Sequence, residues 1–210
     1  MILRLPFEVL VILIPILMFA LCFHEFSHAY VAYLLGDDTA YQKGRMTLNP
    51  LAHLDPIGSL MILFVGFGWA KPVPINPINF KNKHTDIMKV AFAGPASNLI
   101  LAFIGGMIIR CINIFNLYPS DEIAQSIFMF TYINIALAVF NLLPIAPLDG
   151  SQIFGSIISR KNPQLAWKLS MYGPKILLGI IMIGIFTNIS IIGMLLTPFI
   201  KFFMYIFSGL

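Results

Sequence analysis

The residues with the clearest capacity for chemistry are His24, Glu25 and His28, which form a His-Glu-x-x-His motif inside a long apolar run. On an α-helix, residues four positions apart lie on the same face, so the two imidazoles can face a single metal ion. The motif is typical of Zn²⁺ sites in which the glutamate acts as general base toward a water molecule. The alternative is a helix with two buried, hydrogen-bonded histidines. It is less favoured because ionisable groups at membrane depth are costly and usually functional.

A third zinc ligand is needed, because catalytic zinc commonly takes three protein ligands and leaves a fourth position for water. Asp149 is the best candidate, since it follows a long run without charged residues and a proline break that can aim it inward. As an alternative, Asp149 could cap a helix or stabilise a turn before Gly150. His53 and His84 are rival ligands, although both occur in polar loops beside proline or lysine.

The composition is that of a membrane protein. The 210 residues are 59% hydrophobic and only 10% charged, with a mean hydropathy of +0.88, which is too apolar for a soluble domain. The formal net charge of +4 is spread over loops, so it does not indicate nucleic-acid binding. Cys22 and Cys111 lie in apolar runs and are expected to be small buried hydrophobic residues without a disulfide framework.

Apolar runs of sufficient length predict an all-α polytopic membrane protein with about five transmembrane helices. The expected helices cover residues 7–35, 90–109, 123–148, 169–186 and 189–207. The last two could instead form one tilted helix, because residues 176–200 carry no charge. A cleaved signal peptide is a rival explanation of the first run, but cleavage would fall close to the His-Glu-x-x-His motif.

The segment between the first two expected helices is expected to form a small β element with a re-entrant segment. Residues 39–48 mix polar and β-prone side chains and could form a strand, whereas residues 57–70 are apolar but too short to span. The prolines of residues 71–77 exclude a helix and suit an extended edge. Such an edge could hold an unwound substrate by strand addition, and an interfacial loop cover is the alternative.

The second expected helix carries small residues on one face, because Gly94, Asn98, Ala102 and Gly106 recur at intervals of four. Such a face lets another helix approach closely. Asn98 could hydrogen-bond the substrate backbone or a developing oxyanion, and an interhelical hydrogen bond is an equal alternative. The same two roles are open for Asn141, for which satisfying the broken helix is slightly favoured.

Lysine and arginine residues indicate the orientation in the membrane. They occur repeatedly in the segment before residue 90 and in the segment after residue 158, and none lies between Cys111 and Glu122. The positive-inside rule therefore places the first and third loops in the cytoplasm and the metal site nearer the cytoplasmic face. We expect an integral protein of a bacterial cell (inner) membrane.

The combination of motifs resembles the site-2 protease family of intramembrane zinc metalloproteases. The resemblance covers roughly residues 7–155 and rests on five segments: His24-Glu-Phe-Ser-His28, Thr47-Leu-Asn-Pro50, Gly68-Trp-Ala-Lys-Pro72, Gly94-Pro-Ala-Ser-Asn98 and Asn141-Leu-Leu-Pro-Ile-Ala-Pro-Leu-Asp-Gly150. Many members insert a PDZ domain after the second core helix, where this chain has no room for one. Some compact members append a CBS domain, which is not expected here, so the resemblance is to the minimal form.

The resemblance implies that His24, His28 and Asp149 bind one Zn²⁺ per chain and that Glu25 is the general base. The implied activity is hydrolysis of peptide bonds in or near transmembrane segments of membrane-anchored proteins, by Glu-assisted attack of a zinc-bound water. This is the chemistry of regulated intramembrane proteolysis. The implied partners are a membrane-protein substrate and the lipid bilayer, and not nucleic acid.

The fold implied by the resemblance is a helical membrane core with a small β element near the cytoplasmic side. We expect a single membrane-embedded domain, residues 1–210, with a core at residues 7–158 and accessory helices at residues 164–210. A metal transporter or a metal-binding membrane scaffold without proteolysis is the alternative function. A transporter would need polar ligands along a path, whereas this sequence concentrates them at one point, and a pure binding site does not need Glu25.

Overall fold

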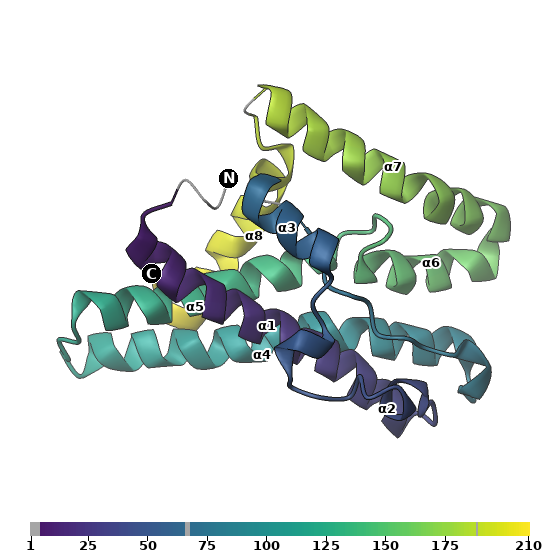
Figure 1. Ribbon diagram of the computed structural model, residues 1–210, viewed down its shortest axis with the longest axis horizontal. Coiled ribbons are helices and arrows are strands. Elements are labelled where there is room, and N and C mark those ends of the chain that lie inside the picture. Colours follow the sequence, from purple (N-terminus) through teal and green to yellow (C-terminus); the bar gives the residue numbers. More distant parts are fainter. Residues whose placement is uncertain (1–4, 66–67, 188) are drawn as a thin grey trace.

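The structure, a computed structural model, describes residues 5–65, 68–187 and 189–210. Within these residues the chain is almost entirely helical (Figure 1). Five of the described helices are long and apolar enough to cross a membrane: α1 (Phe7–Leu34), α4 (Lys83–Ile114), α5 (Asp121–Asn141), α7 (Pro163–Thr187) and α8 (Ile191–Ser208). The predicted all-α membrane fold with five spans is confirmed, and the final apolar run forms two helices rather than one.

The shorter helices lie between these spans. They are α2 (Thr39–Gln42), α3 (Pro56–Val65) and α6 (Asp149–Lys161), with 3-10 turns η2 (Pro50–Ala52) and η3 (Pro77–Asn79). The apolar helix α3 is too short to span and exposes Ile57, Leu60 and Phe64. These exposed side chains suit the re-entrant or interfacial placement predicted for residues 57–70, of which residues 66–67 lie outside the described part of the chain.

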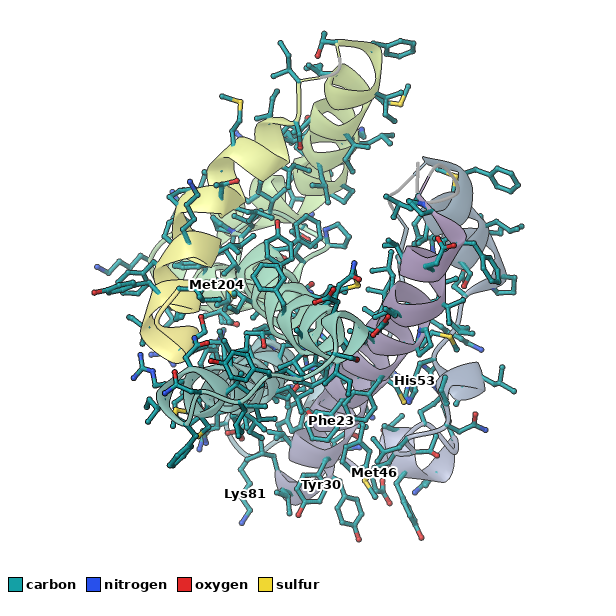
Figure 2. The ribbon with its side chains drawn as sticks, turned by 90° about the vertical axis from the view of Figure 1, so that its left-hand side faces the viewer. Phe23, Tyr30, Met46, His53, Lys81 and Met204 are labelled. Carbon is teal, nitrogen blue, oxygen red and sulfur yellow. The ribbon has the colours of Figure 1, made fainter. Side chains whose placement is uncertain are left out.

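Helix α4 is the centre of the bundle, where it packs against α1, α5, α6 and α8 (Figure 1). The apolar core between α4, α5 and α8 is built from buried side chains, which are Ala102, Ile135, Val139, Leu196, Ile200 and Met204. Met204 of this core lies on α8 (Figure 2). The predicted small-residue face of α4 permits this packing. A Cβ at Gly106 would lie 2.5 Å from the Cβ of Phe207 on α8, so only glycine allows the two helices to approach this closely.

The strand predicted at residues 39–48 is wrong. Thr39 begins the short helix α2 instead, with Asp38 at the N-cap position, and its backbone N–H donates to the side chain of Asp37. Within the described ranges, the β structure between α1 and α4 is one isolated antiparallel bridge between Leu54 and Ala70. The expected small β element therefore does not form a sheet there.

The proline-containing segment, residues 71–80, has one backbone hydrogen bond to the facing segment within the described chain, from Lys71 to His53 at 2.8 Å, and its other contacts with that side of the protein are made by side chains. The carbonyl oxygen of Lys71 accepts a hydrogen bond from Arg45 at 2.6 Å. The backbone N–H of Asn76 donates to Asp37 at 2.7 Å. Since prolines remove further donors from this segment, a ladder of strand hydrogen bonds cannot form along it.

The end of α1 is tied to residues 71–80 by the buried carboxylate of Asp37. Its Oδ1 accepts hydrogen bonds from the backbone N–H and hydroxyl of Thr39, at 3.2 and 2.5 Å, and from the side-chain amide of Asn79 at 2.8 Å. Its Oδ2 accepts from Asn76. A buried carboxylate is tolerated only with such donors, so the loop and the helix end are fixed together.

Asp37 lies outside the spanning helices, and its ionisation contributes to stability. Burial acts to raise the pKa of Asp37, but hydrogen bonds from Thr39, Asn76 and Asn79 outweigh burial and hold the pKa below its usual value. A folded-state pKa below the unfolded-state value, which is about 3.9, gives stability that is present above that pH. The contribution is lost as the pH falls through the folded-state pKa.

We predict that Asp37→Asn loosens residues 71–80 by about 1–3 kcal/mol, because the new NH₂ group would face donors. The measurement is the rate of limited proteolysis of this segment in detergent-solubilised protein, which should rise in the variant. Acidifying the wild type below about pH 4 should have the same effect. Asp38→Asn is the matched control, since exposed Asp38 accepts a surface hydrogen bond from Gln42. Equal proteolysis of Asp37→Asn and wild type would contradict this role.

Candidate metal centre

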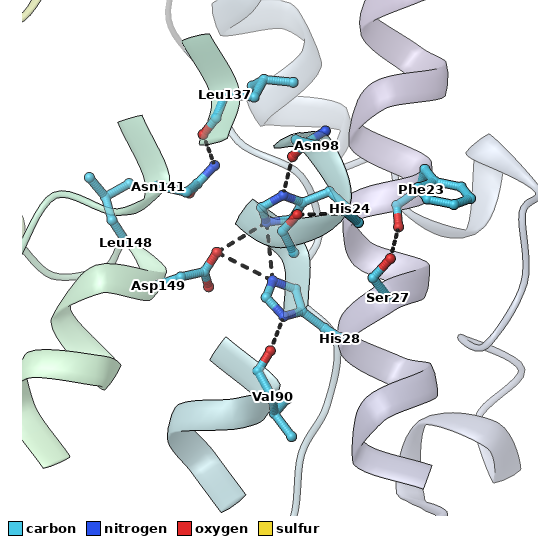
Figure 3. A network of polar contacts seen from close by, with 12 residues as sticks. Phe23, His24, Ser27, His28, Val90, Asn98, Leu137, Asn141, Leu148 and Asp149 are labelled. Carbon is cyan, nitrogen blue, oxygen red and sulfur yellow. Dashed lines mark hydrogen bonds and ion pairs between the residues drawn. The ribbon is translucent and has the colours of Figure 1, made fainter. Parts of the chain in front are cut away.

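Three ligand atoms from two helices meet between α1 and the start of α6 (Figure 3). His24 and His28 lie one turn apart on α1 and are both buried, and their Nε2 atoms are 3.1 Å apart. The Oδ2 atom of Asp149 lies 3.1 Å from Nε2 of His24 and 3.3 Å from Nε2 of His28. The structure thus brings together the three residues that the sequence predicts as ligands.

Hydrogen bonds on the far side of each ring select the same tautomer in both histidines. Nδ1 of His28 is 2.7 Å from the backbone carbonyl oxygen of Val90, and Nδ1 of His24 is 2.6 Å from Oδ1 of Asn98. Both partners are carbonyl oxygens, which only accept hydrogen bonds, so Nδ1 carries the hydrogen in each ring. The Nε2 atoms of the neutral rings therefore present lone pairs toward each other and toward Asp149.

Two lone pairs and a carboxylate oxygen at separations of 3.1–3.3 Å repel one another unless a metal cation or a shared proton lies among them. Zinc fits this triangle. Tetrahedral Zn²⁺ with ligand distances of about 2.0 Å has ligand–ligand separations of about 3.3 Å, so the three atoms match one face of a tetrahedron. The fourth corner is then available for water or substrate, as in catalytic sites.

Helix α4 forms the wall behind the two imidazoles, through three residues spaced one turn apart. Val90 and Asn98 accept the hydrogen bonds of His28 and His24, respectively. Gly94 lies between them, where an added Cβ would be 2.5 Å from Nε2 of both histidines. The close approach of α4 to the metal centre therefore requires glycine at this position.

The predicted break before Asp149 is present, because α5 ends at Asn141 and α6 begins at Asp149. Leu148 occupies the N-cap position, so the carboxylate of Asp149 is not used as the cap. A Cβ at Gly150 would lie 2.2 Å from the carbonyl oxygen of Leu142, so the start of α6 packs tightly on the preceding turn. This packing fixes the carboxylate toward the histidines.

The remaining candidates have different surroundings. Glu25 is half-buried on α1, and its side chain has no hydrogen bond or ion pair with the rest of the described chain. Asn98 is fully buried, and its amide nitrogen donates to Oδ1 of Asn134 at 2.9 Å, so the amide bridges helices rather than facing an open position. Asn141 donates to the carbonyl oxygen of Leu137 in its own helix at 3.1 Å, which favours the role of satisfying the broken helix.

The rival ligands lie elsewhere. His53 is buried in the segment beside α1 (Figure 2), with Nε2 2.8 Å from the carbonyl oxygen of Thr47, and His84 lines a cavity beside α6 and α7. Neither belongs to the three-residue ligand group found within the described ranges. Sequence reasoning missed Val90, which acts through its backbone and leaves no side-chain signal. It also missed Asn134, whose signal is an amide inside an apolar helix.

Comparisons with known proteins show the class of protein to which the chain is similar. The model of peptidase family M50 matches residues 111–183, a stretch that contains Asp149. "Putative zinc metalloprotease YwhC" of Bacillus subtilis is 42% identical over 157 residues, which cover 73% of this chain and 72% of that protein. "Putative zinc metalloprotease Rip2" of Mycolicibacterium smegmatis is 31% identical over 151 residues, covering 69% of this chain and 55% of Rip2. No solved structure matches the chain.

The helical membrane fold and the candidate metal site are compatible with a membrane metalloprotease, and the relatives show the family. The chain belongs to peptidase family M50, the site-2 protease family, and is a zinc metalloprotease with an integral membrane fold. The resemblance drawn from the motifs is therefore confirmed. The chain spans only about half the length of the Rip2 relatives that it matches.

We predict that Gly94→Ala lowers the zinc content of the purified protein by about tenfold or more, because the methyl group would displace both Nε2 atoms. Inductively coupled plasma mass spectrometry of detergent-purified protein measures the content. Gly179→Ala on α7 is the matched control, because its added Cβ would meet no atom within 4 Å. A Gly94→Ala protein with full zinc content would contradict the location of the metal centre.

Proposed function

We propose that the chain is an intramembrane endopeptidase that cuts peptide bonds in or near transmembrane segments of membrane-anchored proteins. The observation that carries the proposal is the set of three ligand atoms, separated by 3.1–3.3 Å, on a helix that is long and apolar enough to span a bilayer. His24 and His28 lie well inside α1 rather than at its ends. Peptide bonds that reach this site therefore come from segments at membrane depth.

The proposed roles follow from the contacts of each residue. His24 and His28, through Nε2, and Asp149, through Oδ2, hold one Zn²⁺. When bound, Zn²⁺ polarises a scissile carbonyl and lowers the pKa of water toward neutrality. Glu25 accepts a proton from the attacking water and passes it to the leaving amine. Its neighbour in sequence is a ligand, and no hydrogen bond within the described chain holds Glu25 away from this task.

For Asn98 we propose action through His24 rather than contact with the substrate. Its Oδ1 accepts from Nδ1 of His24, and its amide nitrogen donates to Ala20 and Asn134. Because both hydrogens of the amide nitrogen already have acceptors, Asn98 has little capacity left to donate a hydrogen bond to an oxyanion. Holding the ring of a metal ligand is a role that commonly strengthens a metal site.

A cavity of about 370 Å³ near the centre, lined by none of the three ligand residues, is the route by which we propose that the centre is reached. Its walls come from the start of α4, from α6 and from α7, and include Pro144 and Ser151, which flank Asp149 in the sequence. Serine side chains make part of the wall polar, and α6 ends in basic residues. By the positive-inside rule, we propose that this route opens to the cytoplasm of a bacterial cell.

Metal transport is the weaker alternative. A transporter needs a succession of polar ligands along a path, whereas the described residues contain one group of three metal-ligating side chains. The metalloprotease relatives also favour hydrolysis. A scaffold that only binds metal would leave Glu25 without a task.

We predict that Glu25→Gln retains zinc and loses about 10²–10⁴-fold in cleavage rate, because the amide cannot accept the proton of the attacking water. The measurement compares membrane-protein fragments and zinc content between cells producing the wild type and the variant. Glu8→Gln is the control, since Glu8 is exposed in the first turn of α1.

Two results would overturn the proposal in different ways. A Glu25→Gln protein that still cuts at the wild-type rate would show that the base is another group. Wild-type fragments whose new ends all map to soluble domains, and none to membrane segments, would refute intramembrane cleavage while leaving the metalloprotease class intact.

A further inference from the structure

Asn134 is a buried amide that the proposed reaction does not use. It lies on the spanning helix α5 and is fully buried. An amide in such surroundings is costly unless its donor and acceptor are both satisfied. Its Oδ1 accepts from Nδ2 of Asn98 at 2.9 Å, and its Nδ2 donates to the carbonyl oxygen of Phe130 at 2.8 Å.

The direction of every hydrogen bond in this network is determined by the backbone carbonyl oxygens at its ends, which can only accept. The carbonyl oxygen of Phe130 only accepts, so the NH₂ group of Asn134 must face it and Oδ1 must face Asn98. Asn98 therefore turns its NH₂ group toward Asn134 and toward the carbonyl oxygen of Ala20, at 3.2 Å. The Oδ1 atom of Asn98 is left for His24, so the hydrogen of that ring lies on Nδ1.

The opposite orientation of Asn98 would be incompatible with a metal. A flipped amide would present NH₂ to Nδ1 of His24 and favour the tautomer with hydrogen on Nε2, where no lone pair remains for a cation. His28 does not share this dependence, because its Nδ1 donates directly to the backbone of Val90. His24 is thus the ligand whose tautomer depends on side chains of α4 and α5.

We propose that Asn134 is a positioning residue that, through Asn98, sets the Nδ1–H tautomer of His24 and keeps Nε2 ready for the metal. The proposal rests on the proposed role of His24 as a zinc ligand. It assigns to α5 a part in the metal centre, although α5 contributes no ligand. Mutation of residues that orient a metal ligand through hydrogen bonds typically changes metal affinity by about 10–100-fold.

The test compares zinc affinity among variants of the full chain in detergent, measured by competition with a chelator. Asn134→Leu removes the acceptor for Asn98 and should weaken zinc binding about 10–100-fold. Asn134→Asp, protonated at this depth, keeps an acceptor and a donor and should stay close to the wild type. Thr131→Val is the matched control, because Thr131 is equally buried on α5 but bonds only Ile127 of its own helix.

Zinc affinity in Asn134→Leu equal to that in Thr131→Val would overturn the proposal, and so would an Asn134→Asp protein as weak as Asn134→Leu. A ¹⁵N NMR measurement on the metal-free wild type tests it without any variant. Nδ1 of His24 should carry hydrogen, and a neutral Nε2–H tautomer would overturn it. Failure of the proposed role of His24 as a zinc ligand looks different, since the wild type would then bind zinc no better than His24→Ala.

Discussion

The structure depends on the convergence of three electron-pair donors at a point inside a helical membrane protein. The Nε2 atoms of His24 and His28 and Oδ2 of Asp149 lie 3.1–3.3 Å apart, with the hydrogens of both rings directed away from the point. Such an arrangement is unfavourable without a metal cation or a shared proton. The fold must therefore hold the ligands against their repulsion, and most polar contacts of the bundle interior contribute to this.

Helix α4 does most of this holding, because it supplies the hydrogen-bond partners of both histidines and the space between them. His28 is paired with Val90 and His24 with Asn98, and Gly94 between them gives the space that both rings need. The two partners are eight residues apart on α4, whereas the ligands are four apart on α1. A backbone carbonyl serves His28, and a side-chain amide serves His24. Because α4 also packs on α5, α6 and α8, displacement of the metal centre would require rearrangement of the whole bundle.

The sequence predicted the spanning helices and the ligands because both leave strong local signals. Long apolar runs indicated the spans, the interval of four indicated the histidine pair, and the proline break before Asp149 indicated a carboxylate at depth. Thr39 was predicted in a strand because its hydrogen bonds to Asp37 compete with β-propensity and are visible only in three dimensions. The role of Val90 was not predictable, since any residue supplies a carbonyl, and that of Asn134 depends on contacts between distant helices.

X-ray absorption at the zinc edge of the purified wild-type protein tests the central claim most directly. The structure predicts one zinc per chain, with two imidazole nitrogens and carboxylate or water oxygens at about 2.0–2.2 Å. Absence of zinc, or a metal bound through cysteine sulfur at about 2.3 Å and without imidazole, would contradict it.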